Sequence, residues 1–301
     1  MTDPTPPPTS QQMSQATSRP TGSVAAQRTP GTPGTPGTPV AYDVTDAVAT
    51  IRIDRPDAMN SLDVATKEAL LAAVTEAAGD PGVRCVVLTG TGRAFCVGQD
   101  LKEHVEILRS DSDNSSDLLF RTVPEHYNPT VTLLATMPKP VLAAVNGVAA
   151  GAGASLALAC DQRLLAHGAG FNFAFAGIGL SCDTGSSWTL PRLVGPAKAL
   201  ELLYEPRTVD SQECLDLGLA TSAVAGDALM DEVQVLAARL AAGPTAAYGA
   251  IRRSVAHSAG HDLASSLAFE ADMMAVTGST EDHRGAVEAF VAKRKPVFEG
   301  R

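Results

Sequence analysis

The stretch from Lys139 to Asp161, KPVLAAVNGVAAGAGASLALACD, decides the fold of this 301-residue chain. Its first part, PVLAAVNG, predicts a short buried strand, and the apolar run from Val148 onward, which opens with glycines at 151 and 153, predicts a helix. These glycines form no phosphate motif, because Leu156 replaces the third glycine of a GxGxxG fingerprint and no GK[ST] follows. Two interpretations remain: exposed helix-end amides that suit a carbonyl oxygen, or small residues that let a helix pack tightly on a strand. From this stretch alone, tight packing is favoured.

Strands and helices alternate in the first part of the chain. Val48 to Ile53 predicts a strand, and apolar residues at helical spacing predict a helix that begins after Ser61 or Asp63. RCVVLTG, residues 84–90, has the continuous apolar character of a fully buried strand. QRLLA, residues 162–166, predicts another strand.

From Pro196 onward the pattern changes to helices almost without interruption. We expect them near residues 196–203, 210–217, 225–242, 244–256, 261–276 and 280–293. The last has a capping signal, STED, at residues 279–282. Strands alternating with helices, followed by a run of helices, predict an α/β core, placed at residues 40–224, and a helical C-terminal region at residues 225–301.

Residues 1–39 have a composition that does not support folding. They are almost purely Pro, Thr, Ser, Gly and Gln and end in the repeat GTPGTPGTP. Such a segment buries too little apolar surface to offset its chain entropy, so we expect a disordered tail.

Charge and cysteine content exclude several classes of function. The net charge is −10, and the tail has two arginines and one aspartate, so the remaining residues carry −11. An acidic domain is a poor partner for nucleic acid or an anionic membrane. The five cysteines form no CxxC pair and no ligand spacing with histidine, so we expect reduced thiols in a cytoplasmic protein, with neither disulfides nor a metal site.

Neither a secretory signal nor a membrane span is expected. The N-terminus lacks a basic region followed by an apolar run. The longest apolar run, residues 141–160, is mostly alanine and glycine and contains Asn146, which favours a buried strand and helix.

Three stretches that combine small residues with a turn follow strand-like segments, where α/β proteins place their sites. They are GRAFCVGQDL (92–101), VAAGAGASLALACD (148–161) and GIGLSCDTGSSWTLPRLVG (177–195). Together with RPDAMNSLD before them and KRKPVFEGR at the end, they resemble the crotonase superfamily, also called the enoyl-CoA hydratase/isomerase family, from about Asp43 to Arg301. Within this superfamily, the sequences of these motifs are most similar to those of the 1,2-epoxyphenylacetyl-CoA isomerase branch.

The resemblance implies a crotonase-type stack of ββα units with a helical trimerisation region, assembled as a homotrimer or a dimer of trimers. It implies an acyl-CoA thioester as ligand, with coenzyme A as part of the substrate and no permanently bound cofactor. The thioester oxygen would be held by two backbone amides, which the motifs assign to Val97 and Ala152. One preorganised donor to a developing enolate is typically worth about 3 to 4 kcal/mol.

Further site residues follow from the same match. Those implied near coenzyme A are Ala58, Gly98, Gln99, Asp100, Gly151 and Lys295. Asp100 is expected mainly to orient its loop. For Lys295, in the basic end 293–295, a solvated charge run is a close alternative. Tyr127, in the variable acyl-side segment, is expected to shape the pocket.

The acidic residues bear on the reaction. Hydratases of the family use two glutamates, whose positions fall on Ser155 and Phe175 here, and neither side chain exchanges a proton at neutral pH. One carboxylate remains, Asp183 in SCDTGSS, which matches the catalytic aspartate of the isomerase-like branch. Its alternative role is to cap a helix that begins near Ser186.

A single carboxylate suits a single-base proton shuttle. Burial against Phe173, Phe175 and Trp188 is expected to raise the pKa of Asp183 towards a useful value. The leading hypothesis is therefore isomerisation of an enoyl-CoA or epoxyacyl-CoA. The alternatives are an enoyl-CoA hydratase of fatty-acid oxidation and a non-catalytic acyl-CoA-binding subunit.

Overall fold

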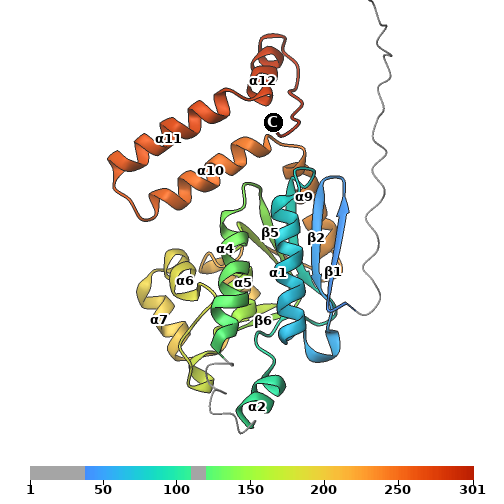
Figure 1. Cartoon of the computed structure of the whole chain (residues 1–301), viewed down its shortest axis with the longest axis vertical. Helices are drawn as coiled ribbons and strands as arrows, with labels where there is room; N and C mark the ends of the chain where they lie inside the picture. The colour runs from blue at the N-terminus through green and yellow to red at the C-terminus, as the bar shows by residue number, and fades with distance from the viewer. Residues whose placement is uncertain (1–37, 110–119) are drawn as a thin grey trace, which may run out of the picture. The chain divides into compact units, whose positions relative to one another are not determined.

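A six-stranded sheet runs through the part of the chain that the computed structural model describes, residues 38–109 and 120–301 (Figure 1). Its order is β1-β2-β3-β5-β7-β10; β1 is antiparallel to β2 and the other neighbours are parallel. The strands are Val40–Thr45, Val48–Ile53, Cys85–Gly90, Val141–Val145, Gln162–Ala166 and Ser222–Val224. The tail expected over residues 1–39 lies outside the described residues, apart from 38 and 39.

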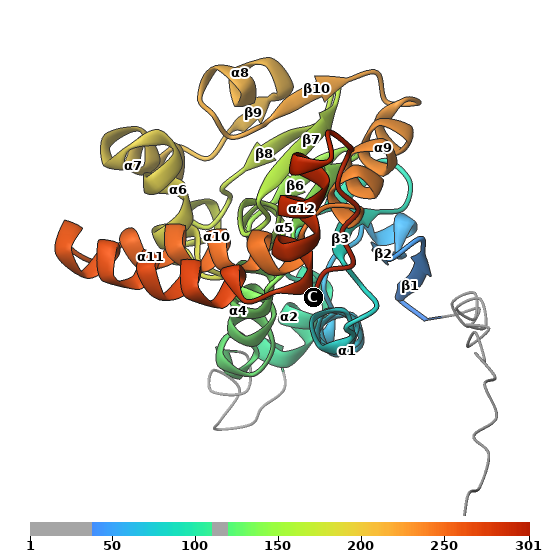
Figure 2. The same ribbon diagram turned by 90° about the horizontal axis from the view of Figure 1, so that it is seen from above.

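Both faces of this sheet are covered. Strands β3 and β5 are buried along their whole length, which explains their continuous apolar sequences. Helices α1 (Val64–Gly79) and α9 (Leu229–Ala241) lie on opposite sides of β2 (Figure 2). The side chain of Asp63 caps α1 by accepting a hydrogen bond from the Thr66 amide at 2.8 Å, as the capping pattern predicted.

A second, four-stranded sheet carries the short strands, in the order β4-β6-β8-β9. They are Ala94–Cys96, Val148–Ala150, Gly170–Asn172 and Thr208–Asp210. Three strands of the large sheet, β3, β5 and β7, each pass after a few residues into a short strand and then a helix, which gives the expected ββα repeat. The prediction of a helix from Val148 was wrong in its first three residues: they form β6, and α5 covers only Ala152–Leu158.

The expected helical run after Pro196 is confirmed, with the short strands β9 and β10 between its helices. Its members are α7 (Pro196–Tyr204), α8 (Ser211–Asp216), α9, α10 (Thr245–Ser258), α11 (Leu263–Gly278) and α12 (Glu281–Val291), and α6 (Ser186–Val194) precedes it. The cap of α12 is Thr280, whose hydroxyl accepts from the His283 amide at 3.1 Å, rather than Ser279. Between α1 and β5 lie α2 (Leu101–Arg109), the π-helical turn η2 (Val123–Tyr127) and α4 (Asn128–Thr136), while η1 (Pro56–Ala58) and η3 (Ala176–Ile178) are short 3₁₀ turns.

Helices α10 and α11 form a long hairpin beside the core, and α12 follows (Figure 1). Unlike α9, which packs on the sheet, α11 buries only Ser266. Large apolar side chains are exposed on the hairpin and on α12; they include Ile251, Val255, Leu263, Leu267, Met274, Phe290 and Val291. The helical C-terminal region therefore carries apolar surface that this single chain leaves uncovered.

Candidate active site

The three motif stretches meet at one edge of the four-stranded sheet. Strands β4, β6 and β8 are parallel neighbours. Because parallel strands end at the same edge, the segments that follow them lie together. These segments are residues 97–100, residues 151–155 and residues 173–185.

Two glycines let the first two segments touch. A Cβ at Gly98, whose φ is +82°, would lie 2.8 Å from the Ala150 oxygen and 3.2 Å from the Ala152 nitrogen. A Cβ at Gly153 would lie 2.1 Å from the Cys96 oxygen. No side chain fits at such distances, so glycine is required at both positions. The two interpretations of the small residues are thus compatible, because tight packing itself brings the 97–99 backbone beside the Ala152 amide.

The Ala152 amide is a donor that the helix itself leaves without an acceptor. Ala152 is the first residue of the seven-residue helix α5, so its N–H has no carbonyl one turn earlier to bind. The preceding Gly151 adopts φ +51° and donates its own N–H to the Asn172 oxygen at 2.9 Å. This bond fixes the turn that presents Ala152 to the neighbouring loop.

The loop after β4 offers candidates for a second donor. The Leu62 N–H donates to the Gly98 oxygen at 2.8 Å, and the Asp100 N–H donates to the Leu62 oxygen at 3.2 Å. Since Leu62 binds the residues on both sides of Gln99, the N–H of Gln99 points to the other side of the loop. Geometry therefore makes Gln99 a second candidate donor beside Val97, which the motif match assigned. Sequence reasoning placed Gln99 only among contacts to coenzyme A, because backbone direction is not visible in the sequence.

Asp100 fastens this loop. Its carboxylate accepts hydrogen bonds from the Ser61 hydroxyl at 2.9 Å, from Arg55 at 3.1 Å and from the Lys102 amide at 3.0 Å. Burial alone would raise the pKa of Asp100, but these hydrogen bonds outweigh it and hold the pKa below its usual value. The Asp100 carboxylate is thus held from several sides, in agreement with a loop-orienting role.

Asp183 lies in the third segment, just before α6. Burial raises the pKa of this carboxyl above its ordinary value, and the Thr184 hydroxyl, which donates to Oδ1 at 2.8 Å, opposes the shift only in part. The N-cap of α6 is Gly185, and no side chain caps the helix. Asp183 contributes only its backbone oxygen, to the Ser186 amide at 3.0 Å, so the capping alternative for its carboxylate is wrong.

The three aromatic side chains expected around Asp183 differ in their own burial. Phe173 is fully buried and Phe175 is 8% exposed. Trp188, however, is 47% exposed, and its ring lies 4.1 Å from the Arg192 guanidinium. The contribution of Trp188 to the burial of the aspartate therefore stays a prediction.

Ser155 links the second segment to the third. It is completely buried; its hydroxyl donates to the Gly151 oxygen at 3.1 Å and lies 2.5 Å from the Ser186 hydroxyl. Phe175, at the other position matched to a hydratase glutamate, is an apolar side chain that would lie 3.9 Å from a Cβ at Gly151. Neither position provides an acid, and Ser155 instead ties α5 to the start of α6.

Tyr127 lines the same region, together with a residue that sequence reasoning missed. The buried Tyr127 hydroxyl donates to Gln99 Oε1 at 2.7 Å, and Lys67 Nζ donates to the same oxygen at 3.2 Å. Burial, with smaller contributions from groups that include Asp183, raises the pKa of Tyr127 well above its ordinary value. The signal for Lys67 was its place three residues before Leu70 on the apolar face of α1.

Two of the residues expected near coenzyme A lie outside the three site segments. Ala58 ends the turn η1 and is half-buried. Lys295 is exposed in the segment after α12. Among the described residues, no hydrogen bond or ion pair joins Lys295 to the three site segments, so its role remains a prediction.

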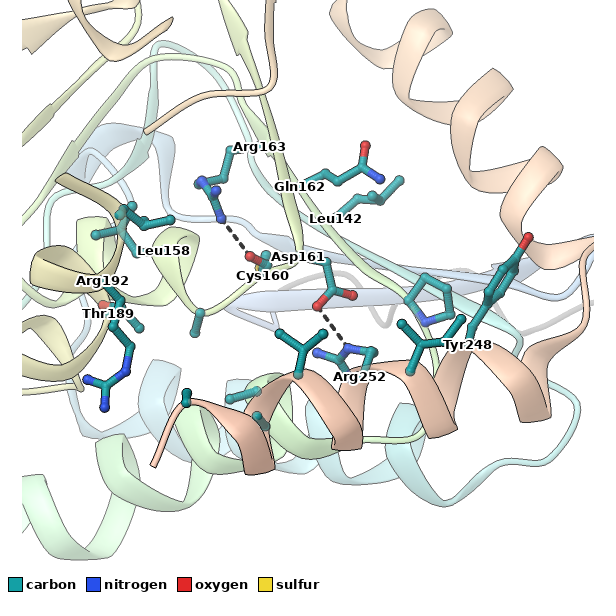
Figure 3. Close-up of a pocket in the computed structure, with 18 of the residues that line it drawn as sticks. Leu142, Leu158, Cys160, Asp161, Gln162, Arg163, Thr189, Arg192, Tyr248 and Arg252 are labelled. Atoms are coloured by element: carbon teal, nitrogen blue, oxygen red, sulfur yellow. Dashed lines mark hydrogen bonds and ion pairs between the residues drawn. The ribbon is translucent and has the colours of Figure 1, made fainter. Parts of the chain in front are cut away.

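A cavity of about 790 Å³ lies elsewhere, between α10, α6 and the β5 and β7 strands (Figure 3). In its wall, Asp161 forms an ion pair with Arg252 of α10 at 2.8 Å, and the Arg163 side chain donates a hydrogen bond to the Cys160 oxygen. A smaller cavity of about 330 Å³ is lined by Lys67 and Gln99, among others. The larger cavity contains none of the predicted site residues, whereas the smaller one adjoins the loop that follows β4.

Residues 38–109 and 120–301 contain no group of three or more metal-ligating side chains close enough to hold an ion. Within the same residues, no helix is both long and apolar enough to cross a membrane.

Comparison with known proteins gives a consistent result. Residues 43–301 match the enoyl-CoA hydratase/isomerase family. The chain is 39% identical over 262 residues to a protein named probable enoyl-CoA hydratase from Rhodobacter capsulatus, covering 87% of this chain and 98% of that one. It is 37% identical over 258 residues to 1,2-epoxyphenylacetyl-CoA isomerase from Escherichia coli, covering 86% and 97%. An enoyl-CoA hydratase crystal structure from Mycobacterium smegmatis matches with a TM-score of 0.77 at 32% identity, covering 86% and 98%.

Proposed function

Because the chain belongs to the enoyl-CoA hydratase/isomerase family, we propose that it isomerises an enoyl-CoA or epoxyacyl-CoA thioester with Asp183 as the proton shuttle. The observation that carries this proposal is the combination of a partly buried Asp183, whose pKa is raised, with the absence of an acid at positions 155 and 175. The isomerase from Escherichia coli, 37% identical, supports the same reaction class.

The backbone would stabilise the intermediate. Removing a proton beside the thioester places enolate charge on its carbonyl oxygen. In the proposed complex this oxygen accepts from the Ala152 amide and from one amide of the 97–99 loop, either Val97 or Gln99. Each preorganised donor typically contributes about 3 to 4 kcal/mol to the transition state, so two donors permit the proton transfer without a metal ion.

Asp183 would move the proton between two carbons. With a 3-enoyl-CoA, the carboxylate removes a proton from C2, the electrons shift into a dienolate, and the same carboxyl returns the proton to C4. The product is the conjugated 2-enoyl-CoA, and the aspartate is ionised again. A buried carboxyl with a raised pKa is a stronger base than an exposed one, which suits both halves of this cycle.

The remaining predicted residues would bind the two ends of the substrate. We assign Ala58, Gly98, Asp100 and Gly151 to the coenzyme A side, with Lys295 at the nucleotide, and Ser155, Phe175 and Tyr127 to the acyl side. The exposed apolar surface of α10 to α12 supports assembly into a homotrimer or a dimer of trimers.

Hydration of a 2-enoyl-CoA is the second candidate. It is favoured by the name of the Rhodobacter capsulatus relative, which is 39% identical. Hydration requires one group to deprotonate water and another to protonate the α-carbon, and Ser155 and Phe175 supply neither. A non-catalytic acyl-CoA-binding subunit is the third candidate.

A spectroscopic assay separates these candidates. The purified protein is given 3-enoyl-CoA and 2-enoyl-CoA in separate reactions, and the absorbance of the conjugated thioester is followed. Conjugation that appears from the 3-enoyl substrate supports the isomerase, whereas conjugation that disappears from the 2-enoyl substrate supports the hydratase. Silence with both substrates, together with retained binding of acyl-CoA, supports the binding subunit. If Asp183→Asn isomerises as fast as the wild type, the proposed shuttle is wrong.

A further inference from the structure

A buried lysine stands beside the loop that follows β4. Lys67 lies near the start of α1, on the face that also carries Leu70 and Val74, and its side chain is 2% exposed. Loss of hydration lowers the pKa of Lys67, and the nearby Glu103 only partly restores it. A buried ammonium is unfavourable unless other groups pair with it, so its partners indicate its purpose.

The partners of Lys67 converge on one oxygen of the loop. Lys67 Nζ donates to Gln99 Oε1 at 3.2 Å, and the Tyr127 hydroxyl donates to the same atom at 2.7 Å. Lys67 Nζ also lies 3.6 Å from Glu103 Oε2 and 5.8 Å from the centre of the Tyr127 ring. Gln99 Nε2 in turn donates to Glu103 Oε2 at 3.5 Å. The Gln99 side chain is therefore held from α1, α2 and η2 at once.

We propose that Lys67 is a positioning residue of the oxyanion loop: by binding Gln99 Oε1, it fixes the backbone of residues 97–99 in the direction that the thioester oxygen requires. This inference rests on the function proposed above. In this proposal Lys67 acts through Gln99 and takes no direct part in the reaction.

Side-chain hydrogen bonds therefore hold the loop on two sides. Asp100 is held by Ser61 and Arg55, and Gln99 is held by Lys67 and Tyr127. Donors in an oxyanion hole are effective because they need no reorganisation as charge develops. Loosening one side of the loop should therefore weaken transition-state binding more than ground-state binding, and lower kcat more than it changes KM.

If Lys67 served stability alone, replacing it should lower the unfolding free energy, whereas a positioning role does not require such a loss. Methionine has nearly the length of lysine and no charge to desolvate, so Lys67→Met should leave the folded state as stable as before, or more stable. The exposed Lys102 offers a matched control, because its side chain makes no ion pair within the described part of the chain. Lys102→Met removes the same charge, three residues after Gln99, without touching the Gln99 side chain.

The first test needs no substrate. Hydrogen exchange of the peptide that contains residues 97–100 is measured on the full-length wild type and on both variants. We expect roughly tenfold faster exchange in Lys67→Met and no change in Lys102→Met. Unchanged exchange in Lys67→Met overturns the inference, even if the wild type proves inactive on enoyl-CoA. Absence of wild-type turnover overturns only the proposed function.

The second test uses turnover. We expect Lys67→Met to lower kcat about tenfold, equivalent to about 1.4 kcal/mol, with KM changed less than about twofold. Combined with Gln99→Leu, the lysine substitution should add almost nothing to the loss from Gln99→Leu alone, because both act through one contact. Additive losses, or a kcat equal to that of Lys102→Met, would show that Lys67 does not position the loop.

Discussion

Gly98→Ala is the sharpest test of the proposed oxyanion site, because one methyl group would separate the two loops. The added Cβ would stand 2.8 Å from the Ala150 oxygen and 3.2 Å from the Ala152 nitrogen, against ordinary contacts of 3.4 Å or more. The loop must therefore move by about half an ångström or more to relieve the contact. The left-handed φ of +82° adds about 1 to 2 kcal/mol of backbone strain for alanine.

The expected activity follows from that displacement. If the loop amide moves out of hydrogen-bonding range, the transition state loses one donor, and kcat falls about 10²- to 10³-fold. Gly168→Ala is the matched control: its φ is +86°, a Cβ there meets nothing within 4 Å, and it lies in the turn between β7 and β8. It carries the backbone strain without the collision.

Urea unfolding and steady-state isomerisation are measured for both variants. Both should lose about 1 to 2 kcal/mol of unfolding free energy from strain, and only Gly98→Ala should lose most of its kcat. If the two variants retain similar activity, the close approach of the loops is not what positions the donors, and the reasoning is refuted.

Three further predictions concern other parts of the chain. Asp183→Asn should abolish isomerisation and raise the urea midpoint at pH 7. A carboxyl whose pKa is raised in the folded state contributes stability below its unfolded-state pKa and loses it as the pH rises through its folded-state pKa. The ionised form of Asp183 is therefore unfavourable for folding at pH 7, and asparagine removes this charge. An unchanged midpoint would contradict the burial of this group. Arg84 donates hydrogen bonds to the Gly243 and Phe298 oxygens and so holds the C-terminal segment. Arg84→Met should lower the unfolding free energy by about 2 kcal/mol and speed proteolysis of that segment. Equal cleavage rates in the variant and the wild type would contradict this role of Arg84. For the proposed trimer, Leu263→Glu combined with Met274→Glu on the exposed side of α11 should give the mass of a monomer in light scattering. An oligomer mass equal to that of the wild type would exclude α11 from the interface.

The longest buried strands and most of the helices were predictable because their sequences carry periodic or continuous apolar patterns. The buried runs of β3 and β5 and the capped start of α1 are examples. Strands β1, β4, β8, β9 and β10 were not predicted. Strand β6 was missed because its three residues show no periodicity of their own, and the apolar residues of α5 follow at once. Its strand conformation is set by pairing with β4 and β8, which no local pattern reveals.

For the site, the motifs identified the segments, whereas the interactions between segments required coordinates. The glycines at 151 and 153 indicated tight packing of a helix on a strand, but only the structure shows that position 98 meets Ala150 and Ala152 and that position 153 meets Cys96. The burial of Lys67 depends on packing among α1, α2 and η2, and lysine in a helix usually reaches solvent. The exposure of Trp188 depends on the direction in which α6 leaves its loop, which sequence spacing does not fix.

The contact between the Ser155 and Ser186 hydroxyls limits how this protein could acquire a different chemistry. At 2.5 Å the two side chains already fill the space between α5 and α6, so a glutamate introduced at position 155 alone would meet Ser186 before it reached the substrate. We expect Ser155→Glu to be destabilised and inactive in water addition, and the pair with Ser186→Gly to tolerate the carboxylate. Hydration assays and unfolding measurements on Ser155→Glu and on the double variant Ser155→Glu with Ser186→Gly would test both expectations. An evolutionary path from this site to a hydratase would then have to change the later serine first, although the earlier one stands where the acid is needed.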